Sequence, residues 1–363
     1  MKKKKSLFIK EGTESPGSIN KAALSNVKKY RKKRLTPSEY KEGILEGKIN
    51  LLSEAITLIE SNNSKHKDLA RQIIELCLPH SGHSIRIGIT GVPGVGKSTF
   101  IESFGSYLVE KHNKKVAVLA IDPSSEKSQG SILGDKTRME NLAIQKNAFI
   151  RPSPSAHSLG GVARKTRESI ILCEAAGYDI ILVETVGVGQ SETAVHSMVD
   201  YFLLLMLAGA GDELQGIKRG IMEMADGLAL TKADGDNIIR CEKAKRDLKH
   251  ALHMFPKKDN NWIPKVFLSS AFENIGIDII WENIVSFENQ IKNTGFFNHN
   301  RNSQNKKWFN ESIQDQMGTL FSNNQNLLSE QANLEQAIMD GKKSPFQAAD
   351  EIFDLFLQEL KNK

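Results

Sequence analysis

The segment that most constrains the fold lies between an apolar run at residues 87–90 and a helical spacing of apolar residues at 100–104. It has the form Gly-x4-Gly-Lys-Ser, and a strand before it and a helix after it are the context that a phosphate-binding loop requires. We expect Lys97 to reach the β- and γ-phosphates and the Ser98 hydroxyl to bind Mg²⁺. The predicted nucleotide-binding residues of this loop are Gly91, Val92, Pro93, Gly94, Val95, Gly96, Lys97, Ser98 and Thr99.

Short apolar runs alternate with amphipathic stretches from residue 84 to residue 290. Unbroken runs rich in β-branched residues are typical of strands buried on both faces, as in mainly parallel sheets with helices on each side. The sequence therefore predicts an α/β fold, a P-loop NTPase with a mainly parallel sheet flanked by helices, over residues 84–290. The expected strands are residues 85–90, 116–122, 179–185, 201–207, 228–231 and 266–269.

Two segments precede this domain. Residues 1–35 are expected to form a basic, flexible arm. Residues 36–83 are expected to form an N-terminal helical subdomain, because apolar residues recur there at helical spacing. Its first helix is predicted to begin at Thr36, with Pro37 in the first helical position and Glu39 completing a capping box.

Residues 291–363 are expected to hold a linker and a C-terminal helical dimerisation arm. The linker is residues 293–310, which are rich in Asn, Gln and Lys. One helix is predicted to end at Gly341 and another to begin at Ser344. Its apolar face can pack on its own domain or on a second copy, and both options remain open. That face consists of Phe346, Ala349, Phe353, Phe356 and Leu360.

Charge and cysteine content restrict the location and the partners. The net charge of +6 comes from residues 1–50, where Lys and Arg greatly outnumber Glu. This arm can be a solvated extension or can bind an acidic protein surface or nucleic acid. The three cysteines form no CxxC pair, which fits a reducing compartment. The start lacks an apolar signal sequence and the most apolar run, residues 201–211, is too short to span a bilayer, so we expect a cytoplasmic protein without a membrane segment.

Carboxylates at the ends of two predicted strands are candidates for magnesium binding. Glu184 and Asp122 each end an expected parallel strand, so both should lie at the same edge of the sheet as the phosphate-binding loop. Gly187 follows Glu184 by three residues, and its N–H is placed to contact the γ-phosphate. Asp135 lies between these strands in the chain and offers a further carboxylate. The predicted metal-binding residues are Ser98, Asp122, Asp135 and Glu184.

The residues after the predicted strand 228–231 bear on the choice of base. Asp234 is expected to accept hydrogen bonds from guanine N1 and N2, a donor pair that adenine lacks, while the stem of Lys232 lies over the base. Thr231 stands where the usual base motif has Asn. Because Thr lacks the amide that contacts guanine and ties the loop down, we expect a lower affinity. Ser270 and Ala271 follow the last strand and should support the base through their backbone.

Together these motifs resemble those of the MeaB family, P-loop GTPases that are associated with methylmalonyl-CoA mutase and also labelled ArgK-like. The segment 211–220 resembles the additional switch loop of this family, and its glycines and charges suit a loop with two conformations. The resemblance is detailed over residues 40–290 and looser in the C-terminal segment. The matching segments are residues 91–99, 121–125, 151–154, 184–192 and 211–220.

The resemblance implies a homodimeric G-protein chaperone that uses GTP, GDP and Mg²⁺. It would bind a B12-dependent acyl-CoA mutase, gate the loading of adenosylcobalamin and help to exclude inactivated cofactor; methylmalonyl-CoA mutase is the expected client. We see no obvious strong base, so we expect slow intrinsic hydrolysis that the partner stimulates. The implied catalytic residues are Lys97, Asp135 and Glu184, with Asp212, Gln215 and Lys218 as switch residues that respond to the mutase.

Three other functions remain open. A metal-insertion GTPase for a nickel enzyme shares the loop, but it needs imidazole or thiolate ligands, and the only close pairs are His80/His83 and His250/His253. A kinase for a transport protein would need a base for a protein hydroxyl, which the sequence does not provide. A GTPase that binds nucleic acid through the basic arm would show a steep salt dependence, and we do not expect nucleic acid as a partner.

Overall fold

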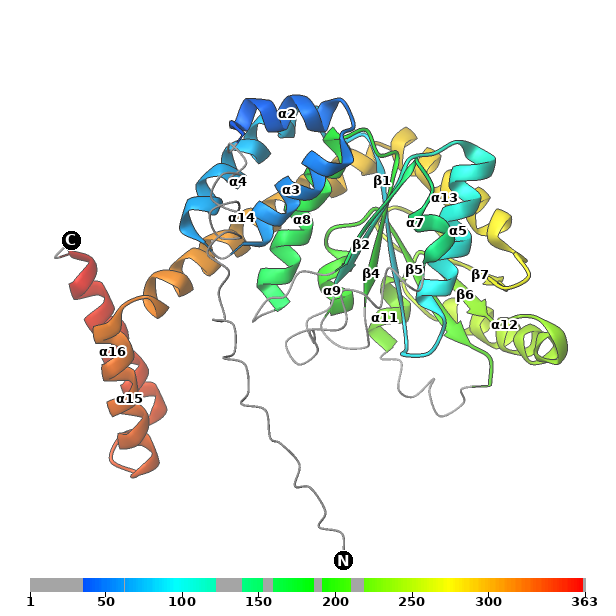
Figure 1. The fold of residues 1–363 in the computed structure, drawn as a ribbon. Coiled ribbons are helices and arrows are strands. Elements are labelled where there is room, and N and C mark those ends of the chain that lie inside the picture. The colour runs from blue at the N-terminus through cyan, green and yellow to red at the C-terminus, as the bar shows by residue number, and fades with distance from the viewer. Residues whose placement is uncertain are drawn as a thin grey trace, which may run out of the picture.

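The computed structural model describes residues 35–61, 63–121, 139–152, 159–185, 191–209 and 219–361, and it places a seven-stranded sheet at the centre of the chain (Figure 1). The strand order is β3-β2-β4-β1-β5-β6-β7, and every neighbouring pair is parallel. This confirms the predicted α/β fold. The strands are β1 (Ile85–Gly91), β2 (Val116–Ile121), β3 (Ala148–Arg151), β4 (Ile180–Thr185), β5 (Tyr201–Leu207), β6 (Gly227–Thr231) and β7 (Lys265–Leu268).

Helices cover both faces of the sheet (Figure 1). The first part of the chain and the α/β domain hold α2 (Pro37–Leu45), α3 (Ile49–Glu60), α4 (Ser64–Cys77), α5 (Lys97–His112), α7 (Glu140–Ala143), α8 (Leu159–Ala175), α9 (Ser191–His196), α11 (Arg219–Met224), α12 (Ile238–Leu252) and α13 (Ile277–Asn293). The C-terminal part holds α14 (Phe296–Ser322), α15 (Gln325–Met339) and α16 (Pro345–Lys361). Two short 3-10 helices are η1 (Leu78–His80) and η3 (Gly235–Asn237).

The central strands read as unbroken apolar runs because each of their faces meets a different hydrophobic core. In β4, Ile181 and Val183 pack in the core shared with α2–α4, α8 and α9. Ile180 and Leu182 of the same strand pack in the core shared with α5 and α13. Successive side chains of a strand point to opposite faces, so burial on both sides requires apolar residues at every position.

The N-terminal helices α2–α4 pack into the first of these cores rather than around a core of their own. The predicted capping box is present: Glu39 N donates to Thr36 Oγ1 at 3.3 Å, and Thr36 N donates to Glu39 Oε2 at 2.6 Å. Polar contacts add to the packing, because Lys165 Nζ on α8 donates to the carbonyl oxygen of Glu60 at 2.6 Å. Residues 36–83 therefore cover one flank of the sheet.

The edge strand β3 was not among the predicted strands. It has only four residues, ends in Arg151 and pairs with β2 alone. A strand of four residues has too few apolar positions to show a hydrophobic period. A strand at the edge of the sheet also does not have to be buried on both faces.

The prediction of a linker at residues 293–310 is wrong, because most of this stretch lies in the 27-residue helix α14. Its polar residues are used inside the molecule rather than in solvent. Arg301 Nη2 donates to the carbonyl oxygen of Ser84 at 2.9 Å, and Gln304 Nε2 donates to that of Val199 at 2.7 Å. A segment rich in Asn, Gln and Lys is usually exposed to solvent, because buried polar groups need hydrogen-bonding partners. The sequence does not show that Arg301 and Gln304 have such partners in distant segments.

Helices α15 and α16 form a hairpin that extends away from the α/β body (Figure 1). The predicted boundary between them is confirmed, because α15 ends at Met339, Gly341 has φ +69°, and α16 begins at Pro345. On α16, Phe356 is buried but Phe346 and Phe353 are exposed. In the part of the chain that the structure describes, no helix is long and apolar enough to cross a membrane.

Candidate nucleotide-binding site

The predicted phosphate-binding loop lies between β1 and α5, near the middle of the sheet. Gly91 ends β1, and a Cβ there would lie 2.5 Å from the carbonyl oxygen of Leu205 on the neighbouring strand, so only glycine fits this close approach. Gly96 has φ +95° and directly precedes the first turn of α5. The two positions explain why the motif requires glycine at both ends, and they aim the N-terminus of α5 at the loop.

Lys97 is bound to the loop that it follows. Its Nζ donates to the carbonyl oxygen of Gly91 at 2.8 Å and to that of Val92 at 3.2 Å. Burial lowers the pKa of the Lys97 amine, and the nearby carboxylates of Glu184 and Glu192 oppose this shift. The cation is therefore held by neutral carbonyl groups at the mouth of the loop, where phosphate oxygens can replace them.

Ser98, in the first turn of α5, and Glu184, near the end of β4, are in contact, as expected for two residues of one metal site. Ile89 on β1 is in register with Glu184 on β4, and Ser98 Oγ donates to Glu184 Oε1 at 3.1 Å. Glu184 is buried, with 5% of its surface exposed. A hydroxyl and a carboxylate at this distance offer oxygen ligands, which Mg²⁺ prefers, so this pair fits a magnesium ion held together with phosphate oxygens and water.

No group of three or more His, Cys, Asp or Glu side chains that could hold a metal is found among the described residues. A magnesium ion that is bound chiefly by a hydroxyl, water and phosphate does not require such a group.

Glu192 was not predicted as a site residue, although the structure places it close to the loop. It lies in the first turn of α9, is fully buried, and its charge raises the pKa of Lys97 against the effect of burial. A carboxylate near a buried amine favours the charged form of the amine. An acidic residue in the first turn of a helix is common for capping alone, so the sequence carried no signal that separates the two roles.

The base motif is tied to the phosphate-binding loop by side chains. Thr231 Oγ1 donates to the carbonyl oxygen of Val95 at 2.7 Å and lies 3.3 Å from that of Met206. Lys232 has φ +55°, and its Nζ donates to the carbonyl oxygen of Gly94 at 3.2 Å. The Thr231 hydroxyl thus ties the base motif to the phosphate-binding loop although the Asn amide is absent, and the lower affinity expected from the missing contact with guanine stays a prediction.

Asp234 and the residues after β7 meet at the same end of the sheet. Ser270 Oγ donates to Asp234 Oδ2, and Ala233 N donates to the carbonyl oxygen of Ser269 at 3.1 Å. Ala271 follows directly and is half-buried. The structure thus brings together the predicted base residues Thr231, Lys232, Asp234, Ser270 and Ala271 beside the loop that holds Lys97 and Ser98.

The remaining predicted site residues lie outside the described part of the chain. They are Asp122, Asp135, Gly187, Asp212, Gln215 and Lys218. Strand β2 ends at Ile121, one residue before Asp122, and Ile121 is in register with Thr185, which follows Glu184. The chain therefore enters this segment at the predicted edge of the sheet, and the roles of these residues stay predictions.

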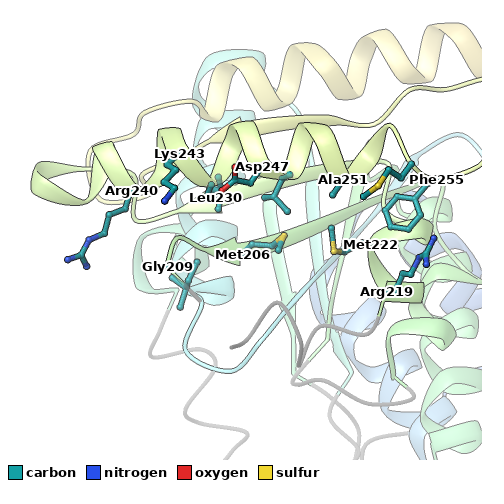
Figure 2. Close-up of a pocket in the computed structure, with 14 residues that line it drawn as sticks. Met206, Gly209, Arg219, Met222, Leu230, Arg240, Lys243, Asp247, Ala251 and Phe255 are labelled. Atoms are coloured by element: carbon teal, nitrogen blue, oxygen red, sulfur yellow. The ribbon is translucent and has the colours of Figure 1, made fainter. Parts of the chain in front are cut away.

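A separate hollow of about 690 Å³ lies between α11, α12 and the ends of β5 and β6 (Figure 2). Its floor is apolar and rich in methionine, with Met206, Met222 and Leu230, and Arg219 and Arg240 lie at its rim. It contains none of the predicted phosphate or base residues. An apolar floor is unsuited to a triphosphate, so the phosphate-binding loop remains the candidate nucleotide site.

The parallel sheet and the Gly-x4-Gly-Lys-Ser loop before α5 define a P-loop nucleotide-binding protein, in which Asp234 is the residue predicted to select guanine. The sequence model described as methylmalonyl Co-A mutase-associated GTPase MeaB matches residues 52–326. The chain belongs to this family.

Curated relatives and a solved structure agree with this assignment. A protein named GTPase ArgK from Escherichia coli (strain K12) is 46% identical over 279 residues, which cover 77% of this chain and 84% of the relative. A protein named methylmalonic aciduria type A homolog, mitochondrial, from Mus musculus is 43% identical over 324 residues, with coverage of 86% and 78%. A crystal structure described as a LAO/AO transport system kinase has a TM-score of 0.71 at 36% identity and covers 88% of this chain and 97% of that chain.

Proposed function

We propose that this GTPase is a G-protein chaperone for a B12-dependent acyl-CoA mutase, with methylmalonyl-CoA mutase as its client. In this role it gates the loading of adenosylcobalamin and protects the mutase from inactivated cofactor. The observation that carries the proposal is the match of residues 52–326 to GTPases described by their association with methylmalonyl-CoA mutase. The contacts of the site support it, because Lys97 lies at the mouth of the loop and Ser98 donates to Glu184, an arrangement that fits a nucleotide phosphate and a magnesium ion.

The proposed cycle begins with the phosphates of GTP on the N–H groups of the loop and at the N-terminus of α5. Lys97 exchanges the carbonyl oxygens of Gly91 and Val92 for phosphate oxygens, and Ser98 and Glu184 hold the magnesium ion or its water. When bound, magnesium neutralises charge that develops on the phosphates. Asp122 and Asp135 complete this set in the proposal.

Hydrolysis is proposed to be slow without the client. In the described part of the site, the carboxylates that raise the pKa of Lys97 against the effect of burial are those of Glu184 and Glu192, and neither is an imidazole. Asp212, Gln215 and Lys218 are proposed to respond to the mutase and complete the catalytic arrangement. An isolated rate near the roughly 1–100 per second that is typical of kinases would contradict this part of the proposal.

We further propose that the protein is a homodimer in the cytoplasm. The dimer is supported by the apolar side chains that the C-terminal hairpin leaves exposed, such as Phe346, Phe353 and Leu360. The location is supported by the cysteines, since Cys77, Cys173 and Cys241 are buried and form no disulfide.

The test is GTP hydrolysis by the purified full chain, alone and with a B12-dependent acyl-CoA mutase, with ATP as the control nucleotide. Stimulation by the mutase and no hydrolysis of ATP are the expected results. If GTP is hydrolysed but the mutase changes nothing, the GTPase stands and the client is wrong. Transfer of labelled phosphate to a protein side chain would instead favour the kinase alternative.

A further inference from the structure

Phe272 is the most exposed large hydrophobic side chain in the described part of the chain, with 90% of its surface accessible. It follows Ala271, the last residue of the predicted base support. Single exposed apolar residues are common on protein surfaces, so exposure alone does not indicate a function. Phe272 differs from other exposed apolar residues because it directly follows the predicted base residues and stands on a loop held by hydrogen bonds.

The loop that carries Phe272 is closed by several hydrogen bonds. Ser270 and Ile275 exchange two backbone bonds, of 3.0 Å and 2.9 Å. Glu273 N donates to Ser270 Oγ at 3.2 Å, and Ser103 Oγ on α5 donates to Asn274 Oδ1 at 2.6 Å. The ring therefore stands on a loop that is fixed to both the sheet and α5, and a ligand that contacts it does not have to order the loop first.

This loop lies between the base motif and the first turn of α5. On one side Ser270 Oγ donates to Asp234, the residue that selects guanine. On the other side Phe272 and Ala271 line one end of a hollow that extends along α5 from Thr99 to Lys111, and Thr99 follows Lys97 by two residues. Because this loop is bonded to Asp234 and borders Thr99, a nucleotide with its base at Asp234 and its phosphates at Lys97 has its base next to the loop that carries Phe272.

The chemistry of Thr231 explains why an aromatic contact is useful here. The hydroxyl of Thr231 has a single proton, and it is donated to the carbonyl oxygen of Val95 at 2.7 Å. The motif thus keeps its bond to the phosphate-binding loop but offers no side-chain amide to the base. Stacking on an aromatic ring strengthens the binding of any base, because every base has a π face, and it requires no hydrogen-bonding partner.

We propose that Phe272 is a nucleotide-binding residue whose ring stacks on the guanine base held by Asp234. Asp234 then selects guanine, whereas Phe272 adds affinity without selecting among purines. The stem of Lys232, whose Nζ donates to the carbonyl oxygen of Gly94, is expected to cover the base elsewhere in the same site. The proposal rests on the GTPase activity of the family and is independent of the identity of the client.

The first experiment measures the affinity of the full chain for GDP and IDP, without any mutase, in Phe272→Ala, Phe272→Leu and Phe272→Tyr. Loss of the ring in Phe272→Ala should weaken both nucleotides by about tenfold, and Phe272→Tyr should stay within about twofold of the parent protein, because base–aromatic stacking depends on the ring. Ile263→Ala is the matched control, since Ile263 is 73% exposed and lies before β7, at the other end of the strand that leads to this loop. Unchanged GDP affinity in Phe272→Ala would overturn the proposal.

A second measurement separates stacking from a merely structural effect. The guanine H8 proton of bound GDP should show an upfield ring-current shift in the parent protein and in Phe272→Tyr. This shift should be reduced in Phe272→Leu, which keeps an apolar side chain but has no ring. A shift that persists in Phe272→Leu would show that the ring does not stack on the base. Thermal unfolding without nucleotide, expected to be the same for all variants, checks that the loop remains folded.

Discussion

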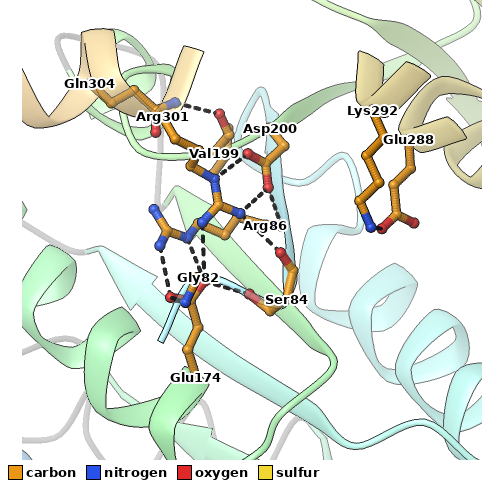
Figure 3. A network of polar contacts seen from close by, with 10 residues as sticks. All are labelled: Gly82, Ser84, Arg86, Glu174, Val199, Asp200, Glu288, Lys292, Arg301 and Gln304. Carbon is orange, nitrogen blue, oxygen red and sulfur yellow. Dashed lines mark hydrogen bonds and ion pairs between the residues drawn. The ribbon is translucent and has the colours of Figure 1, made fainter. Parts of the chain in front are cut away.

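The two edges of the central sheet use charge in opposite ways. At the carboxyl edge, Lys97 is bound by neutral carbonyl groups, so its charge remains available for phosphate. At the amino edge, Arg86, Glu174, Asp200 and Arg301 bind one another in a buried network (Figure 3). The side chains of Glu174 and Asp200 are fully buried there. The comparison indicates that one edge is built for a ligand and the other for the assembly of the chain itself.

The network at the amino edge joins segments that are distant in sequence. Arg86 Nε on β1 donates to Glu174 Oε1 on α8 at 2.8 Å, and Arg301 Nε on α14 donates to Asp200 Oδ1 at 2.6 Å. Burial alone would raise the pKa of Glu174, but the hydrogen bond and charge of Arg86, with the charge of Arg301, lower it. The carboxylate therefore stays ionised inside the protein because two guanidinium groups replace its water.

The same region holds α14 against the segment that follows α9. Trp308 Nε1 donates to the carbonyl oxygen of Ser197 at 3.2 Å, and the guanidinium of Arg167 lies 5.2 Å from the centre of the Trp308 ring. These contacts explain why a helix with so many polar residues packs on the body of the protein. They also attach α14, the helix that precedes the C-terminal hairpin, to a segment that comes after β4, the strand that ends with Glu184 and Thr185.

The largest effect is expected from breaking the amino-edge network. Glu174→Gln leaves Arg86 without its buried anion. It should lower the free energy of unfolding by about 4 kcal/mol, because removing one partner of a buried ion pair leaves the other charge buried and uncompensated. Urea unfolding with and without saturating GDP measures this loss. A variant as stable as the parent would show that the network does not hold the fold together.

The pH dependence of this effect has a definite sign. The folded-state pKa of Glu174 is lowered, so its contribution to stability is complete above its ordinary pKa near 4.5 and is lost as the pH falls through the lower folded value. The difference in stability between the parent protein and Glu174→Gln should therefore be constant at neutral pH and should shrink below about pH 4.5. A difference that grows on acidification would contradict this assignment.

A change at the carboxyl edge should affect activity rather than stability. Lys97→Ala removes the cation that faces the phosphates, and GTP hydrolysis should fall by about 100- to 1,000-fold, the usual cost of removing one donor to a developing charge. Unfolding without nucleotide should change less than in Glu174→Gln, because Lys97 donates hydrogen bonds to carbonyl oxygens of its own loop and Glu184 keeps its bond from Ser98. Lys249→Ala, at an exposed position of α12, is the control.

Base selection should depend on a single carboxylate. Asp234→Asn replaces an acceptor by a donor toward guanine N1 and N2, so GDP should bind about 50-fold more weakly, in line with the cost of leaving charged hydrogen-bonding groups unpaired. Xanthosine diphosphate, which carries an oxygen in place of the amino group, should bind more tightly than to the parent protein. Competition binding with the two nucleotides measures both changes, and an unaltered preference would exclude Asp234 from base contact.

The smallest effect is expected at the tie between the two parts of the site. Thr231→Val keeps the shape of the side chain but removes the bond to the carbonyl oxygen of Val95, so GDP affinity should fall by about fivefold, as expected for one neutral hydrogen bond. The measurement is GDP binding, with Thr57→Val as the control because the Thr57 hydroxyl bonds only within α3 and with Arg151. Equal affinity in Thr231→Val would mean that the tie does not position the base.

Much of the carboxyl edge could be predicted from sequence, because its chemistry depends on residues that lie close together in the chain. The loop at residues 91–98, the base residues 231–234 and Glu184 at the end of β4 all lie where their motifs indicate. Backbone geometry imposes the spacing of these residues along the chain, so a single sequence is enough to recognise the motifs. The fold class follows for the same reason, since strands buried on both faces must be apolar at every position.

The parts that sequence reasoning missed depend on contacts between distant segments. Nothing in the sequence near Arg301 shows that it lies against Asp200 and Glu174, and a polar stretch around it is equally typical of a linker. Likewise, Glu192 is recognised as part of the site only when its distance from Lys97 in space is known.

The sequence by itself therefore determined the class of fold, the phosphate-binding loop and the preference for guanine, because local geometry requires particular residue types at those positions. Only the tertiary structure decided that α14 is a helix bound to the body, that Thr231 ties the base motif to the loop, and that Phe272 is exposed beside the base site. Each of these depends on side chains brought together by packing, and packing partners carry no fixed spacing along the chain.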